Sequence, residues 1–456
     1  MAQKLNRWIV IVMLFVLAGC TAERRYKPDA QNIIPKHWNA IDTHLISKNE
    51  NLSCIAWWRQ FHDPTLNDLI TSGLRHNNNV QTARGAILAA QGELKRVKLN
   101  WLPTMDWSAG YSSFPYLGFP GVLAVIVPTY TMNAFKQLSE QRIAQYELRI
   151  SQDLRDGIKL SVIAQIAGNY FSLLAQIEQL QLIKHIDDDL TQQVAIFQSE
   201  YHDGLISEIP LAQEQSQLQR IKAEEQVIEQ NIVIHQNMLR YLINENPKRF
   251  KLKQRFQNIN TDQLIVGSLP VNIVENRPDI RQATNELKAA NVGVDFAVSH
   301  FLPTVQLSAA RGDIATIANG TTLGQPVYFN QTLLGSPVLN LALFGQLQKS
   351  RGINKAIYYR YLDTLRKVMR DVNNDLSAHE YYTKRLNDTR IAKQQLTRAY
   401  RLTQKLQREG IISYSELLNE KIKLDEIKIV FNAHMRDQLI TIVNLYQNLA
   451  VGYGCT

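Results

Sequence analysis

The sequence predicts an α+β membrane protein that is internally duplicated, with long helices and short β-strands in each half. Apolar residues return every three or four positions from residue 134 to about residue 202, with no proline, which indicates one helix on the order of 100 Å long. Short segments in which polar and apolar residues alternate indicate strands, and the same succession of patterns recurs about 200 residues later. Helices of this length need long neighbours packed side by side, as in a coiled coil.

The N-terminus has the pattern of a lipoprotein signal. Lys4 and Arg7 precede an apolar core, residues 8–17, which is too short to cross a bilayer, and small residues then lead to Cys20. We therefore expect residues 1–19 to be a signal peptide and the Cys20 thiol to carry a lipid. The alternative is an ordinary signal peptide with an incidental cysteine.

Composition narrows the class of protein. The chain has 456 residues, of which 45% are hydrophobic and 20% are charged, a balance unlike that of a helical membrane protein. No later segment supplies about 18 uninterrupted apolar residues, so a membrane-spanning part would consist of β-strands. The net charge of +9 is spread along the chain, which favours solvated helix faces and argues against nucleic-acid binding.

Residues 20–62 are expected to be an irregular tether in which Trp57 and Trp58 are packing anchors. The two cysteines of the mature chain besides Cys20 are Cys54 and Cys455, near its two ends. An oxidising compartment permits a disulfide between them, and unpaired thiols are the alternative.

The first repeat is expected over residues 63–260. A helix begins at Asp63, where aspartate caps and proline follows, and a second helix covers residues 80 to about 100. A strand beginning at Met105 alternates apolar and polar residues, a second strand covers residues 122 to about 131, and the long helix follows.

The second repeat is expected over residues 261–456. A helix ends near His300, and Leu302-Pro303-Thr304 repeats Leu102-Pro103-Thr104 after 200 residues. An alternating strand follows, and then a return strand whose end, residues 337–344, would place Leu339, Leu341 and Leu343 on one face. A second long helix covers residues 346 to about 408.

Each long helix ends at a similar short sequence. Gly204 and Gly410 suit the left-handed conformation that ends a helix, and Ser207 and Ser413 suit the cap of the next helix. We therefore expect a tight turn and a further long helix in each repeat.

With these segments in order, the chain resembles the TolC-like outer-membrane efflux family, in its lipoprotein branch. The most specific stretches are Arg277-Pro278-Asp279-Ile280, Phe301-Leu302-Pro303-Thr304, Pro337-Val338-Leu339-Asn340-Leu341 ending in Phe344, and Asn444-Leu445-Tyr446. The resemblance implies a homotrimer in which each protomer gives four strands to a shared outer-membrane barrel and its helices to a periplasmic tunnel. Residues 130–136 lack the family's acidic-aromatic-glycine motif, and the first hairpin, with Pro115, Pro120 and Pro128, looks short and irregular.

The resemblance also implies partners. A periplasmic membrane-fusion adaptor would dock at the two turns, and an inner-membrane pump of the RND or ABC type would supply energy. The docking residues would be Gly204, Leu205, Ser207, Gly410, Ile411 and Ser413. The family narrows its tunnel with an acidic residue shortly after the second turn. The matching position here is Asn419, with Glu416 and Glu420 on the same helix.

No enzyme motif stands out in the sequence. It contains no His-Glu-x-x-His pair, no Gly-x-Ser-x-Gly elbow and no phosphate-binding glycine loop before a helix, so we expect no catalytic residues, no cofactor and no metal site. Asp187, Asp188 and Asp189 face different directions on the long helix, and a solvated acidic patch is expected.

These observations predict an outer-membrane channel that completes a tripartite efflux system and passively exports small molecules, either drugs or metal ions. One alternative is the same channel serving protein secretion from an ABC pump. A further alternative is a lipid-anchored periplasmic coiled-coil scaffold without a pore, against which the alternating strands argue.

Overall fold

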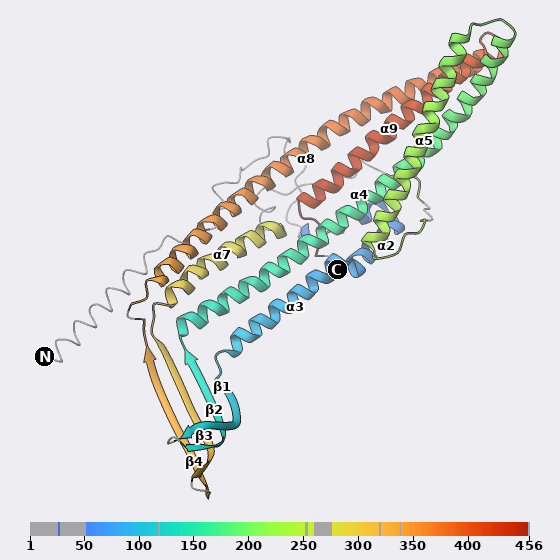
Figure 1. The fold of residues 1–456 in the computed structure, drawn as a ribbon. Helices are drawn as coiled ribbons and strands as arrows, with labels where there is room; N and C mark the ends of the chain where they lie inside the picture. Colours follow the sequence, from blue (N-terminus) through green and yellow to red (C-terminus); the bar gives the residue numbers. More distant parts are fainter. Residues whose placement is uncertain are drawn as a thin grey trace. The chain divides into compact units, whose positions relative to one another are not determined.

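The computed structural model describes residues 26–27, 52–116, 119–250, 254–259, 276–318, 321–337 and 339–454 (Figure 1). The longer helices are α2 (Pro64–His76), α3 (Asn78–Leu99), α4 (Ala134–His202), α5 (Glu208–Leu242), α7 (Pro278–Ser299), α8 (Ala342–Arg408) and α9 (Tyr414–Asn448). The strands are β1 (Thr104–Tyr116), β2 (Phe119–Met132), β3 (Thr304–Ala318) and β4 (Thr321–Gly335).

The predicted duplication is visible in the lengths of these elements. Helices α3 and α7 have 22 residues each, α4 has 69 and α8 has 67, and α5 and α9 have 35 each. In each half of the chain, two strands lie between the 22-residue helix and the long helix. The predicted succession of helix, strand, strand, long helix, turn and long helix is confirmed for both halves.

The chain forms two compact units that do not coincide with the two repeats. Of the described residues, one unit contains 26–27, 85–153 and 280–364, and we call it the strand unit. The other contains the described residues within 52–84, 154–279 and 365–454, and we call it the helical unit. Each repeat contributes to both units, because α4 and α8 each contribute residues to both.

The strand unit contains one antiparallel sheet in the order β1-β2-β3-β4. The prediction of an irregular first hairpin is confirmed, since the β1–β2 register shifts between Ser112 and Tyr116. The β2–β3 ladder stops at Ile126 and resumes at Thr129, where Pro128 has no N–H to donate toward β3. The prediction that this hairpin is short is wrong, because β1 and β2 have 13 and 14 residues against 15 in β3 and β4.

The predicted return strand is present as β4, but its predicted end at residues 337–344 is wrong. Strand β4 ends at Gly335, and α8 begins at Ala342, where the Asn340 side-chain oxygen accepts a hydrogen bond from the Ala342 N–H at 3.2 Å. Pro337 cannot donate to a ladder, and Asn340 starts a helix, so the leucine alternation does not form a strand. Leu339 and Leu341 are exposed.

Side chains on α7 join the helices of the strand unit. Arg281 and Asn285 donate hydrogen bonds to the Asp153 carboxylate on α4, at 2.9 and 2.8 Å. Val294 and Ala297 pack against Leu347 of α8. On β1, the predicted alternation leaves Met105, Trp107 and Tyr111 exposed on one face.

The helical unit is held by long apolar seams and by its N-terminal segment. Ile186 and Leu190 of α4 pack with Leu218 of α5 and Ile422 of α9. Helix α4 contains an 18-residue stretch apolar enough to cross a membrane, but 67% of that stretch is buried inside the structure. We therefore interpret it as the buried packing seam of α4.

The predicted roles of Trp57 and Asp63 are confirmed in the helical unit. The buried Trp57 ring stacks on Tyr446 with 4.7 Å between ring centroids. Asp63 caps α2 by accepting hydrogen bonds from Thr65 and Leu66 N–H, and it also accepts one from the Tyr170 hydroxyl. Burial, together with this hydrogen bond, raises the pKa of Tyr170, which keeps its hydroxyl protonated as a donor.

Candidate functional site

The two turns that close the long helices lie at the same end of the helical unit (Figure 1). Gly204 and Gly410 both have a φ of 72°, as the sequence predicted. The Leu205 N–H donates to the Glu200 carbonyl at 2.8 Å, and the Ile411 N–H donates to the Leu406 carbonyl at 3.0 Å. This pattern satisfies the last carbonyls of each helix and is available to glycine at little steric cost.

The two turns present apolar side chains to solvent. Leu205 is 74% exposed and Ile411 is 64% exposed, each directly after the left-handed glycine. Ile209, in the first turn of α5, is also exposed. Large apolar side chains held out by a rigid turn are typical of a surface that binds another protein.

The two predicted capping serines behave differently. The Ser413 hydroxyl accepts a hydrogen bond from the Glu416 N–H at 3.1 Å, and the Glu416 carboxylate accepts one from the Ser413 N–H at 3.2 Å. This reciprocal pair is a capping box. Ser207 stands at the same place before α5 but makes no side-chain cap.

This difference predicts the effect of matched substitutions. Ser413→Ala should destabilise the start of α9 by about 1 kcal/mol, because it removes the acceptor for an N-terminal amide. Ser207→Ala should change little. Hydrogen exchange at the amides of each first turn measures both, and equal protection changes in the two variants would contradict the assignment.

Close to the turns, polar side chains join α4 to α9 inside the helical unit. The Lys421 ammonium donates to the Asp189 carboxylate at 2.6 Å, and Asp189 is only 1% exposed. Burial opposes the charge on Lys421, but the hydrogen bond and charge of Asp189 prevail and raise the pKa of Lys421. The prediction of a solvated acidic patch is therefore wrong for Asp189, which the packing of α9 covers.

A second set of polar contacts lies nearer the turns. The buried Gln193 amide donates to Asn419 at 3.0 Å and to Ser415 at 3.3 Å. The Tyr414 hydroxyl donates to Gln192 at 2.9 Å. These residues and the Asp189–Lys421 pair form what we call the α4–α9 clasp. The sequence offered one signal for the clasp, since Asp189 and Gln193 occur at helical spacing within the apolar stripe of α4.

All three predicted constriction residues already have hydrogen-bond partners in the structure. Glu416 belongs to the capping box, Asn419 accepts from Gln193, and Glu420 pairs with Lys423 one turn along at 2.7 Å. Glu420 and Asn419 therefore have different surroundings, as their spacing on the helix requires. Their role in narrowing a tunnel stays a prediction.

The N-terminal tether contacts the strand unit near its start. The Tyr26 carbonyl accepts a hydrogen bond from Asn291 at 2.9 Å, and its ring stacks on Tyr358 with 4.5 Å between centroids. Cys20 lies outside the described residues. Cys54 has a free, exposed thiol, and Cys455 lies outside the described residues, so the disulfide stays a prediction.

Three histidines in the helical unit have a lowered pKa, mainly because of burial. They are His235, His379 and His434. His434 accepts a hydrogen bond from Arg385 at 2.7 Å on one ring nitrogen and contacts the Thr389 hydroxyl with the other at 2.8 Å. This arrangement suits the neutral ring.

We expect the free energy of unfolding to fall as the pH drops below about 6.5, because the unfolded histidines then bind more protons than the folded ones. A variant with all three histidines changed to Gln should lose less stability between about pH 6.5 and pH 5. Thermal melts of both proteins over this range measure the difference. An identical pH slope would contradict the assignment.

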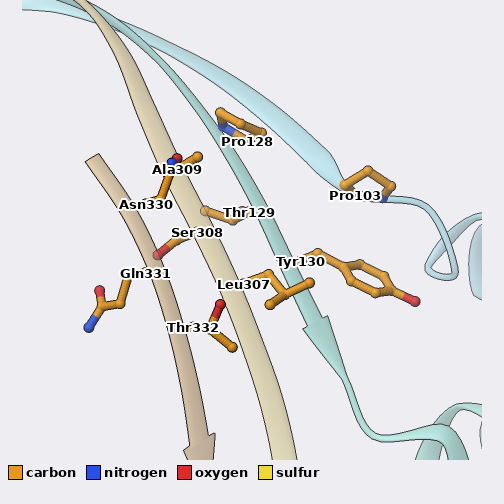
Figure 2. Close-up of a pocket in the computed structure, with 10 residues that line it drawn as sticks. All are labelled: Pro103, Pro128, Thr129, Tyr130, Leu307, Ser308, Ala309, Asn330, Gln331 and Thr332. Atoms are coloured by element: carbon orange, nitrogen blue, oxygen red, sulfur yellow. The ribbon is translucent and has the colours of Figure 1, made fainter. Parts of the chain in front are cut away.

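The sheet carries a cavity of 330 Å³ that is lined by residues of β2, β3 and β4 near the helix-side ends of these strands and by Pro103, just before β1. Figure 2 shows its lining, in which Thr129, Leu307 and Thr332 come from three neighbouring strands. The Tyr130 ring extends from β2 away from β3 and β4, on the side of Pro103 (Figure 2). In the described part of the chain, no cluster of His, Cys, Asp and Glu side chains could hold a metal ion.

Comparison with known proteins agrees with this architecture. The sequence profile of the family described as outer membrane efflux protein matches residues 69–245 and 269–451. The chain is 22% identical to the probable efflux pump outer membrane protein TtgC of Pseudomonas putida, over 97% of this chain and 94% of that protein. It is 20% identical to the probable outer membrane lipoprotein SilC of Salmonella typhimurium, over 97% of this chain and 98% of that protein.

Solved structures share the fold. The open state of the Neisseria gonorrhoeae MtrE outer membrane channel matches with a TM-score of 0.81 at 19% identity, covering 95% of this chain and 98% of that one. The Campylobacter jejuni CmeC outer membrane channel matches with a TM-score of 0.76 at 19% identity, covering 92% and 93%. The predicted α+β channel fold, with helical hairpins and a four-stranded sheet, is confirmed.

Proposed function

Because the chain belongs to the outer membrane efflux protein family, we propose that it assembles as a homotrimer and forms the outer-membrane duct of a tripartite efflux system. Strands β1 and β4 each have only one neighbour among the described strands, so both edges of the sheet carry unpaired backbone groups. Within a bilayer, unpaired backbone groups cost several kcal/mol each, so strands must close into a barrel. This observation carries the proposal, since pairing β1 of one copy with β4 of the next removes both free edges, and the proposed trimer would supply the strands of the closed barrel.

The turn end of the helical unit is the proposed docking surface for a periplasmic membrane-fusion adaptor. Leu205 and Ile411 supply exposed apolar side chains on two similar rigid turns. The α4–α9 clasp lies beside them and holds two helices together. An adaptor that binds the open turn end more tightly than the closed one would shift the population toward the open channel, with no energy source in this protein.

Small molecules are the proposed cargo, and an inner-membrane pump supplies the energy. The relatives include proteins described as antibiotic and toluene efflux pump components of Pseudomonas putida. The channel itself needs only to exclude lipid from its lumen and to let the small molecules pass through.

Lipid attachment at Cys20 is the proposed membrane anchor. Tyr26 is held on α7 and α8, and six extended residues reach about 20 Å. From Asn291, α7 rises about 12 Å to its end at Ser299, beside the start of β3. The lipid on Cys20 can therefore reach the level at which the strands begin. Labelling cells with radioactive palmitate should mark the wild-type protein and leave Cys20→Ala unlabelled, and label retained on that variant would contradict the site.

Deletion of the gene in a host without related channels tests the proposed function. We expect accumulation of several toxic small molecules to rise and the wild-type gene to restore export. Unchanged accumulation of every compound, with the protein present in the outer membrane of the parent, would contradict the proposal.

A further inference from the structure

A second cavity lies in the strand unit where the helices give way to the strands. It has a volume of 710 Å³, within the range of about 300–1,000 Å³ that is usual for ligand pockets. The end of α3, the start of α4 and the adjoining ends of β1 and β2 enclose it. Its lining mixes charged, polar and apolar side chains, among them Arg96, Leu99, Tyr130, Lys136, Gln137 and Glu140. We call it the junction cavity.

One buried group in this cavity lacks a partner. Gln137 is 6% exposed, and its amide N–H₂ donates to the Asn100 and Thr131 carbonyls at 3.2 and 3.3 Å. Its side-chain oxygen has no hydrogen-bond partner among the described residues. A buried acceptor left without a donor costs about 1–3 kcal/mol, so the site suits a ligand that donates a hydrogen bond.

Charges of both signs surround this acceptor. Lys136 is half-buried in the first turn of α4, where its backbone N–H donates to the Asn133 cap at 3.0 Å. Arg96 lies on α3 and also pairs with Glu93 at 2.6 Å. Glu140 is one helical turn beyond Lys136 and lines the same cavity. The Lys136 and Arg96 cations of the cavity can therefore bind an anionic group of a ligand. The Glu140 carboxylate and the Gln137 side-chain oxygen can accept hydrogen bonds from a cationic group or a hydroxyl of the same ligand.

In the proposed channel, β1 and β2 enter the bilayer from this junction, so the cavity lies at the level of the membrane surface. Leu99 and Leu102, which line the cavity, are exposed, and so are Met105 and Phe135, which adjoin lining residues in the sequence. Tyr130 projects on the Pro103 side of β2, and both residues line the junction cavity (Figure 2). Tyrosine is enriched at this depth, where its ring is apolar and its hydroxyl is wet.

We infer that the junction cavity binds the zwitterionic headgroup of a glycerophospholipid from the periplasmic leaflet. Phosphatidylethanolamine is the lipid whose headgroup fits the cavity. Lys136 and Arg96 hold the phosphate. The ammonium donates to the Gln137 side-chain oxygen and to Glu140, while the acyl chains lie along the apolar residues of the rim. A fully ionised phosphate alone leaves the Gln137 oxygen without a donor. The inference rests on the proposed membrane-spanning channel, to which it adds a lipid site, and it does not depend on the cargo.

Native mass spectrometry of the detergent-purified channel tests this site. The wild-type protein should retain phosphatidylethanolamine, and Lys136→Gln should reduce the retained lipid about tenfold, as expected for one charged hydrogen bond. Lys98→Gln is the matched control, because Lys98 is exposed on α3 and does not line the cavity. Glu140→Gln should lower the preference for phosphatidylethanolamine over phosphatidylglycerol, since only the former carries an ammonium.

Three results would overturn the inference. The first is a wild-type channel that carries no phospholipid, and the second is an equal loss of lipid in Lys136→Gln and Lys98→Gln. The third concerns chemical acylation of the Lys136 amine. If inorganic phosphate protects this amine from the acylating reagent as well as phosphatidylethanolamine vesicles do, the cavity is a simple anion site. Folding of each variant is checked by its melting temperature, and export by the same variants is measured separately, so failure of the lipid site is distinct from failure of the channel.

Discussion

Lys421→Met is expected to open the turn end of the channel. The substitution removes the ammonium that pairs with Asp189 at 2.6 Å and leaves a carboxylate that is 1% exposed without its partner. Breaking a fully buried pair from one side costs about 3 kcal/mol or more, but the Lys421 side chain is 39% exposed, so solvent should reduce the cost here to about 1–2 kcal/mol. Water entry between α4 and α9, or their local separation, relieves that cost, so the clasp should open in a much larger fraction of molecules.

Planar-bilayer recordings would measure the open probability of this variant, and cell sensitivity to a large hydrophilic antibiotic would report the same opening in the outer membrane. Lys423→Met is the matched control, because Lys423 is on the same helix and pairs only with the partly exposed Glu420 among the described residues. Asp189→Leu combined with Lys421→Met should be close to the wild type, since no buried charge remains. Equal behaviour of Lys421→Met and Lys423→Met would contradict the role of the clasp.

Leu205→Asn together with Ile411→Asn is expected to abolish adaptor binding while leaving the channel folded. Both side chains are largely exposed, so their loss should hardly change the free energy of unfolding. Apolar anchors at the centre of an interface commonly contribute about 2 kcal/mol or more each, so the affinity for the adaptor should fall by a hundredfold or more.

Co-purification of the adaptor with the channel would detect this loss. Titration of the adaptor over channel immobilised on a sensor surface would measure the change in affinity. Ile391→Asn is the control, since Ile391 is an exposed apolar residue on α8 about 28 Å along the helix from Gly410. Equal adaptor binding by the double variant and by Ile391→Asn would contradict the assignment of the turns as the docking surface.

The sequence predicted most of the fold because its strongest signals are local. The apolar period over residues 134–202 matches α4, and both glycines at the ends of long helices have the left-handed conformation that they favour. The two Leu-Pro-Thr units both lead directly into strands, β1 and β3. These features depend on backbone conformation within a few residues, which the sequence specifies directly.

The sequence could not predict which side chains meet across helices. Asp189 looked like part of a solvated patch because its neighbours on α4 are also acidic, whereas α9, more than 200 residues away in sequence, covers it with Lys421. The missing cap at Ser207 is a different case, because the sequence itself has Pro210 where Glu416 completes the capping box after Ser413, and the prediction overlooked this local signal. The residues at 337–344 alternate like a strand, but the proline and the asparagine there start α8.

The α4–α9 clasp and the junction cavity likewise depend on tertiary packing. Gln193 is a polar residue on an otherwise apolar stripe, and burial against α9 gives it its partners. Gln137 is ordinary in sequence and becomes notable only because its oxygen is buried without a donor.

Single-channel conductance of the detergent-purified mature protein, measured with its mass in the same detergent, tests the central claim most directly. A trimeric mass with discrete conductance steps, and a higher open probability in Lys421→Met than in Lys423→Met, is the predicted result. A monomer that neither inserts into the bilayer nor produces steps in any variant would contradict the channel.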